Sequence, residues 1–92
     1  MRFEWDAKKA AVNLQRHRVS FEEATTVFGD AFARTYEDPA HSESEARELT
    51  FGFSSAGRAL VVSHCERGKR VRIISARPMT RRERQQYEEN NR

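Results

Sequence analysis

The sequence predicts an α+β domain in which two helices come first, four antiparallel strands follow, and one helix ends the chain. Three observations support this order. Apolar residues recur at helical spacing up to about residue 30, and from there to residue 77 they follow a period of two. The last segment is polar but has a helix-start signal. With 92 residues, the chain is expected to form one domain, residues 1–92, with the helices packed on one face of the sheet.

Two helices are predicted after a short extended piece at the N-terminus. Asp6 is a suitable N-cap for the first helix, which ends near His17. The apolar residues that share one face of this helix are Ala7, Ala10, Ala11 and Leu14. Ser20 and Glu23 have the spacing of a capping box and open the second helix, which ends at Gly29.

Four strands and a last helix are predicted from the alternating pattern. The strands cover residues 33–38, 47–54, 58–66 and 70–77, with a polar loop around Pro39 and turns at Gly57 and at residues 67–69. The third strand is almost continuously apolar and is therefore expected to be central. Thr80 and Glu83 form a second capping box at the start of the last helix, whose only large apolar residue is Tyr87.

Charge divides the chain into two unequal halves. Residues 1–57 carry a net charge of −3 and residues 58–92 carry +6, which favours a polyanion or an acidic partner. No apolar run reaches the roughly 18 residues of a membrane span, and the N-terminal segment is too acidic for a signal peptide, so a cytoplasmic protein is expected. Cys65 is predicted to be a small buried hydrophobe, and no Cys/His cluster has metal-ligand spacing.

Polar residues near the ends of the last two strands are the candidates for chemistry. Alternation places His64 and Glu66 on one face of their strand, whereas it places Arg72 and Arg77 on opposite faces of theirs. An imidazole, a carboxylate and guanidinium groups suit RNA cleavage without a metal, with His64 or Glu66 as the base or the acid. The predicted catalytic residues are His64, Glu66, Arg67, Arg72 and Arg77. The predicted RNA-binding residues are Lys9, Arg70, Arg81 and Tyr87.

Each of these side chains also has a structural interpretation. His64 has the position of a hydrogen-bonded histidine in a sheet, and Glu66 has the neighbours for a surface ion pair. Glu83 fits its capping role, Tyr87 fits packing, and Arg77 could dock against the last helix.

Several motifs together resemble the BrnT family of small ribonuclease toxins. They are FEWDAKKAAVNLQRHRVSFEEATTVF, then HCERG, RVRIISAR and RRERQQYEE, and the resemblance runs from about Phe3 to Glu89. The positions that match recurrent family residues are Trp5, Asp6, Lys9, Asn13, His17, His64, Glu66, Arg67, Arg72, Arg77, Glu83 and Tyr87. The chain departs from the pattern at Arg18, where glycine is common, and at Pro78.

The resemblance implies a RelE-like fold and the toxin of a type II toxin–antitoxin system. Such toxins cleave RNA without a metal or other cofactor and stop translation. It implies a BrnA-type antitoxin with a ribbon-helix-helix domain, a heterotetrameric complex, and contact with operator DNA only through the antitoxin. Two alternatives fit the basic half of the chain. One is a nucleic-acid-binding module or corepressor without catalysis, and the other is a docking surface for an acidic peptide.

Overall fold

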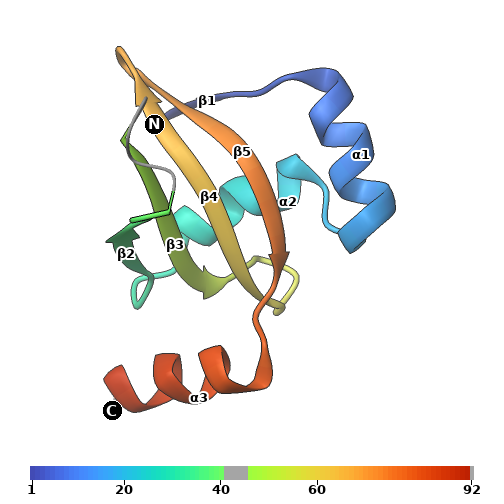
Figure 1. The fold of residues 1–92 in the computed structure, drawn as a ribbon. Coiled ribbons are helices and arrows are strands. Elements are labelled where there is room, and N and C mark those ends of the chain that lie inside the picture. Colours follow the sequence, from blue (N-terminus) through green and yellow to red (C-terminus); the bar gives the residue numbers. More distant parts are fainter. Residues whose placement is uncertain (41–45, 92) are drawn as a thin grey trace.

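A computed structural model describes residues 1–40 and 46–91 of the chain (Figure 1). The elements in chain order are β1 (Arg2–Glu4), α1 (Ala7–His17), α2 (Phe21–Thr26), the 3-10 helix η1 (Val27–Gly29), β2 (Arg34–Glu37), β3 (Arg47–Phe53), β4 (Ala59–Arg67), β5 (Arg70–Pro78) and α3 (Arg81–Asn90). Residues 41–45 of the predicted polar loop lie outside the described residues.

The strands form one mixed sheet with the order β1-β5-β4-β3-β2. Strands β2 to β5 are the predicted antiparallel meander. The prediction of four strands was wrong, because β1 adds a fifth strand parallel to β5, with Phe3 opposite Val71. Three residues are too few to show an alternating pattern, so the sequence indicated only an extended piece there.

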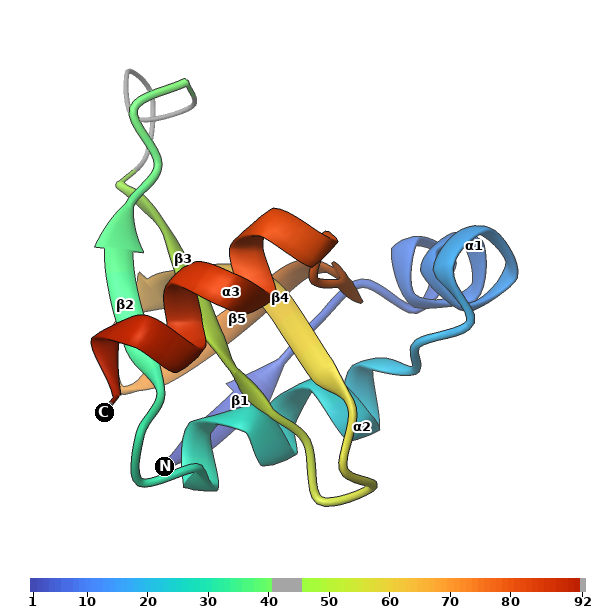
Figure 2. The ribbon, with the colours of Figure 1, turned by 90° about the horizontal axis from the view of Figure 1, so that it is seen from below.

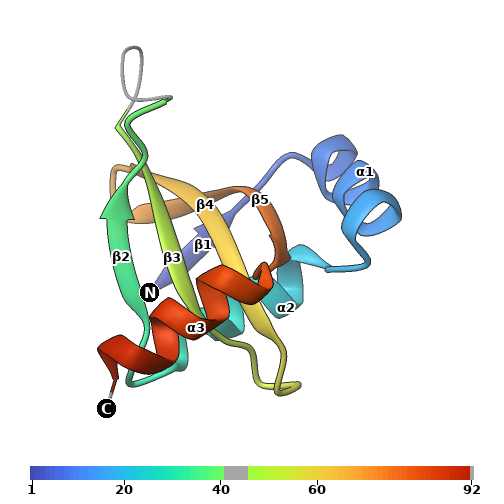
Figure 3. The same ribbon diagram turned by 60° about the horizontal axis from the view of Figure 1, so that its bottom comes forward.

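Helices lie on both faces of the sheet, and the prediction that they share one face was wrong. In the view of Figure 2 the sheet separates α2 from α3, and Figure 3 shows α3 crossing the strands near one end. We call the two surfaces the α2 face and the α3 face. Thr50, Val62 and His64 belong to the α2 face, whereas Phe51 and Val61 belong to the α3 face.

The main hydrophobic core fills the space between α2 and the α2 face. Its fully buried residues are Val19, Phe21, Ala24, Val27, Leu60, Val62, Ile73 and Ala76. The N-terminal segment joins this core through aromatic contacts: Phe3 packs on Phe28 at 5.2 Å between ring centroids, and Trp5 packs edge-on against Phe21 at 5.9 Å. These contacts fix β1 and the start of α1 against the rest of the domain.

A β-bulge in β5 changes which arginines share a face. Ser63 lies opposite Ser75 and His64 lies opposite Ile73, so Ile74 is an extra residue in β5. The extra residue reverses the alternation beyond it. The predicted separation of Arg72 and Arg77 was therefore wrong, and both lie on the α3 face, opposite Cys65 and Val61 respectively.

Asn13 attaches α1 to the edge of β5. Its side-chain amide donates to the backbone carbonyls of Val19 and Ala76, each at 2.9 Å, and its side-chain carbonyl accepts from the Ala76 N–H at 3.1 Å. The amide thus takes the place of a neighbouring strand where β1 no longer pairs with β5. This accounts for a polar residue that is only 6% exposed.

The helix ends follow the predicted capping signals with two differences. Asp6, Ser20 and Thr80 all accept backbone N–H bonds as N-caps, and the capping box of Thr80 with Glu83 is complete. Glu23 instead pairs with Arg58 and accepts from the Ser54 hydroxyl at 2.7 Å. Arg18 ends α1 in the left-handed conformation with φ of 58°, a geometry that usually selects glycine.

Candidate functional site

The α3 face presents the three arginines of β5, Arg70, Arg72 and Arg77, and each of them contacts a carboxylate. Arg77 lies near the end of the strand, where the chain turns toward α3. Arg72 lies nearer the start of the strand, on the other side of the bulge at Ile74. Because both project from the same face, they can contact one polyanionic strand together. This arrangement was missed by simple alternation, because nothing in the residues around Ile74 indicates a bulge.

Arg77 and Glu83 form a two-pronged ion pair. Arg77 Nη1 donates to Glu83 Oε1 at 2.7 Å and Nη2 donates to Oε2 at 2.9 Å. The Arg77 hydrogen bonds are the main cause that lowers the pKa of Glu83 from 4.5 to about 2, and they raise the pKa of Arg77. Both side chains stay partly exposed, at 40% for Arg77 and 23% for Glu83, so an anion can reach the pair. The predicted docking of Arg77 against the last helix is confirmed.

Tyr87 fastens α3 to the body of the domain. It is 8% exposed, its ring packs on Phe53 at 5.7 Å, and its hydroxyl donates to Asp30 Oδ2 at 2.6 Å. Burial, with the Asp30 hydrogen bond, raises the pKa of Tyr87. The packing interpretation of Tyr87 is confirmed, whereas its predicted contact with RNA stays a prediction that its burial argues against. The guanidinium of Arg84 lies over the Phe53 ring at 5.3 Å and adds a cation–π contact.

Arg72 shares a carboxylate with Arg70 at the other end of β5. Arg72 Nη2 lies 2.9 Å from Glu4 Oε2, and its Nε donates to the same oxygen at 3.0 Å. Arg70 Nη1 lies 3.7 Å from Glu4 Oε1. Glu4 is in β1 directly opposite Arg72, so the fifth strand neutralises part of the charge that the sequence assigned to RNA binding.

His64 lies on the other side of the sheet from these arginines. It is 5% exposed, its Nε2 is 2.7 Å from the Thr50 hydroxyl, and its ring packs edge-on against Phe28 at 4.8 Å. Burial lowers the pKa of His64 to about 4, so the ring is neutral at pH 7. The structural interpretation of His64 is confirmed. Its catalytic role stays a prediction that its position argues against, because the sheet separates the ring from Arg72 and Arg77.

Glu66 and Arg67 are exposed at the end of β4, beside the turn to β5. Glu66 lies on the α2 face like His64, opposite Val71, but beyond the edge of the core. The structure therefore does not bring Glu66 together with the Arg77 pair. The predicted roles of Glu66 and Arg67 stay predictions.

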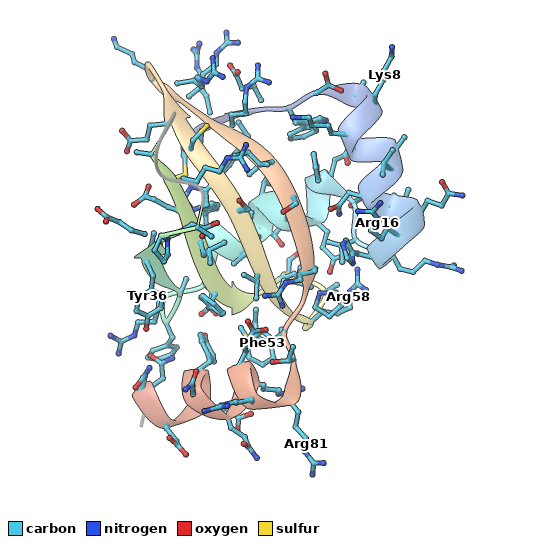
Figure 4. The ribbon with its side chains drawn as sticks, viewed as in Figure 1. Lys8, Arg16, Tyr36, Phe53, Arg58 and Arg81 are labelled. Atoms are coloured by element: carbon cyan, nitrogen blue, oxygen red, sulfur yellow. The ribbon has the colours of Figure 1, made fainter. Side chains whose placement is uncertain are left out.

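Lys9 lines a second basic surface between α1 and β5. A hollow of about 290 Å³ is bordered there by Lys8, Lys9, Arg16, His17, Asn13 and Ser75 among others. Figure 4 shows Arg16 on the side of α1 that faces β5. Arg81, by contrast, is the first residue of α3 and points away from the sheet (Figure 4).

A hollow beneath α3 contains residues that the sequence interpretation did not assign to the site. It measures about 260 Å³ and lies between the α3 face and the helix. Arg34 and Tyr36 come from the edge strand β2, and Gln86 and Asn90 come from α3. Glu83 also lines it, so the ion pair with Arg77 borders this hollow. The alternation of residues 33–38 places Arg34 and Tyr36 on one face and could have identified this pair.

Within residues 1–40 and 46–91, no group of three or more His, Cys, Asp or Glu side chains is arranged to hold a metal ion. In the same part of the chain, no helix has the length and apolar character needed to cross a membrane.

The fold agrees with comparisons to known proteins. Residues 5–83 match the family described as "Ribonuclease toxin, BrnT, of type II toxin-antitoxin system". The chain is therefore a type II toxin–antitoxin protein of the ribonuclease class, and it belongs to the BrnT family. Membership in a type II system implies an antitoxin partner.

A solved structure supports the fold independently. The crystal structure of the Brucella abortus ribonuclease toxin BrnT superposes with a TM-score of 0.69 and 19% sequence identity. The match covers 88% of this chain and 99% of that chain. No curated protein sequence matches the chain. At this identity the structural match establishes the shared fold, whereas family membership rests on the match over residues 5–83.

Proposed function

We propose that this chain is a toxin that cleaves RNA without a metal ion and thereby inhibits translation. The reaction takes place on the α3 face, where Arg77 and Arg72 bind the phosphate backbone. Membership in the BrnT family supports the ribonuclease class, and the pair of guanidinium groups on one face supports the location. Guanidinium groups suit this role because their planar fork binds two phosphate oxygens and stabilises the charge that develops on them.

The Arg77–Glu83 pair is the observation that carries the proposal. Its guanidinium already binds two oxygens of an anion in the geometry that a phosphate would use. When RNA binds, Arg77 exchanges part of its contact with Glu83 for the phosphate. Glu83 then loses the partner that lowers its pKa, and its carboxylate becomes a better proton acceptor.

The reaction follows from these roles. The carboxylate of Glu83 accepts the proton of the ribose 2′-hydroxyl, and the 2′-oxygen attacks the neighbouring phosphorus. Arg77 stabilises the additional negative charge on the phosphate oxygens, while Arg72, at the other end of β5, binds the backbone further along. The bond from phosphorus to the 5′-oxygen of the next nucleotide breaks, a 2′,3′-cyclic phosphate is left, and a water molecule protonates the departing oxygen. Lys9 and the other cations beside α1 contribute attraction for the backbone without entering the reaction.

The partner follows from the same family membership. We propose a BrnA-type antitoxin with a ribbon-helix-helix domain, which forms a heterotetramer with the toxin and alone contacts the operator DNA. A twofold antitoxin with one toxin on each side is the simplest closed arrangement.

The experiment is cleavage of a synthetic RNA by the purified chain, free of antitoxin, in excess chelator. The expected result is cleavage that persists in chelator and stops when the nucleotide 5′ of the cut site is 2′-deoxy. Cleavage only after a divalent metal is added would contradict metal independence. Salt-sensitive binding of RNA without cleavage would favour the alternative of a binding module.

A further inference from the structure

The hollow beneath α3 has two chemically different walls. The sheet contributes Tyr36, Leu49 and Phe51, which are aromatic or apolar, and at its edge Arg34, whose guanidinium is bound to the backbone carbonyl of Asn90. The helix contributes the side-chain amides of Gln86 and Asn90, which each carry hydrogen-bond donors and an acceptor. A flat ligand with an apolar face and a polar edge matches this combination.

Tyr36 is held in place although it is accessible. Its ring packs edge-on against Phe51, with 5.8 Å between centroids and an angle of 76° between planes. Even so, the residue is 47% exposed, which is unusual for a large aromatic residue that is fixed by its neighbours. An aromatic ring that is oriented and accessible provides a surface for stacking at a low entropic cost.

The hollow is formed before any ligand arrives. Arg34 Nη2 donates to the backbone carbonyl of Asn90 at 2.7 Å and links β2 to the C-terminal end of α3. Tyr87 fixes the same helix through Asp30, and Arg77 fixes its first turn through Glu83. Contacts at both ends of α3 thus set its distance from the sheet, so a ligand need not pay to open the space.

We propose that this hollow binds a nucleobase of the RNA substrate, by stacking on Tyr36 and by hydrogen bonds to Gln86 and Asn90. The inference rests on the proposed function, because it makes this base a neighbour of the phosphate that Arg77 contacts. Glu83 lines the hollow on one side and binds Arg77 on the other, so the two subsites share one residue. Single-stranded RNA is commonly recognised by stacking of an unpaired base on an aromatic ring together with hydrogen bonds to its edge.

Binding of nucleoside 5′-monophosphates to the intact chain tests the inference without any need for cleavage. We expect the NMR signals of the Gln86 and Asn90 side-chain amides to shift and saturate as a nucleotide is added. Ribose 5-phosphate and inorganic phosphate should not produce these shifts. If ribose 5-phosphate shifts the same amides equally, or if no nucleotide shifts them, the hollow is not a base site.

Variants of Tyr36 give a second readout on RNA. Tyr36→Ala should weaken nucleotide binding about tenfold and raise the KM for RNA, whereas Tyr36→Phe should keep both near their original values. Phe32→Ala is the matched control, because Phe32 is also exposed, at 62%, but does not line the hollow.

A folded Tyr36→Ala variant with unchanged nucleotide affinity would overturn the inference. Cleavage by such a variant at an unchanged KM would also overturn it, although the proposed function would stand. Nucleotide binding by a chain that never cuts RNA would instead refute only the proposed function.

Discussion

Lowering the pH from 7.5 to 4 should destabilise the protein mainly through His64. The ring is 5% exposed beneath Phe28, and burial lowers its pKa from 6.5 to about 4. Between these two pH values the unfolded chain binds a proton that the folded chain does not bind. The contribution of the neutral His64 ring to the free energy of unfolding is therefore fully present above pH 6.5 and is lost as the pH falls toward 4. At 1.36 kcal/mol per pKa unit, the loss from this residue is about 3 kcal/mol.

Urea unfolding between pH 7.5 and pH 4, followed by the fluorescence of Trp5, measures this loss. Trp5 packs against Phe21 in the core, so its emission reports on global unfolding. We expect the free energy of unfolding of the wild type to decline by about 3 kcal/mol more than that of His64→Gln over this range. His17→Gln is the control, because it removes an imidazole from the hollow between α1 and β5. Its free energy of unfolding should decline over this pH range as much as that of the wild type.

The titration of carboxylates does not affect the difference in pH dependence between the wild type and the histidine variants. The groups with lowered pKa values include Glu23, Asp30 and Glu83, and their contributions are shared by the wild type and both variants. An NMR titration of His64 should give a midpoint near 4. A midpoint near 6.5, or equal pH dependence in the wild type and His64→Gln, would refute the account of a buried neutral ring.

Three further changes test individual contacts by urea unfolding. Glu83→Gln should lose about 1–2 kcal/mol at pH 7, a value reduced for the partial exposure of the pair, and the difference should vanish as the pH falls from 4.5 to about 2. A difference that is constant across this range would exclude the ion pair as its cause. Tyr87→Phe should lose about 1–2 kcal/mol, because the Asp30 carboxylate loses a donor, and unchanged stability would show that this bond is dispensable. Arg18→Gly should gain about 1 kcal/mol by relieving the left-handed backbone, whereas a loss of stability would contradict that reasoning.

Local sequence signals predicted most of the elements but not how they meet. The caps at Asp6, Ser20 and Thr80 use residues two to three positions away, and all three were predicted correctly. Strand β1 depends on pairing with β5, which lies about 68 residues further along the chain, and three residues carry no periodic signal of their own. The side of the sheet that α3 covers is likewise set by a distant contact, between Tyr87 and Asp30.

The candidate site failed to follow from alternation for a related reason. Alternation holds only while two strands remain in register, and the extra residue Ile74 reverses it halfway along β5. Arg77 thereby joins Arg72 on the α3 face, whereas simple alternation placed the two arginines on opposite faces. The burial of His64 depends on Phe28, which lies in the 3-10 helix η1, where the sequence predicted the last turn of an α-helix. The residue types were therefore informative about chemistry, whereas their grouping required the tertiary structure.

The single-turnover rate of RNA cleavage by Arg77→Ala tests whether the reaction takes place beside Arg77 on the α3 face. The matched control is Arg82→Ala, which removes an exposed arginine from the first turn of the same helix that Arg77 contacts. Both variants are measured in chelator, after urea unfolding has shown that each is folded. We expect Arg77→Ala to lower the rate by about a hundredfold or more, because a charge-stabilising donor is lost, and Arg82→Ala to stay within about twofold of the wild type. A folded Arg77→Ala variant that cleaves RNA at the wild-type rate would place the reaction elsewhere on the molecule.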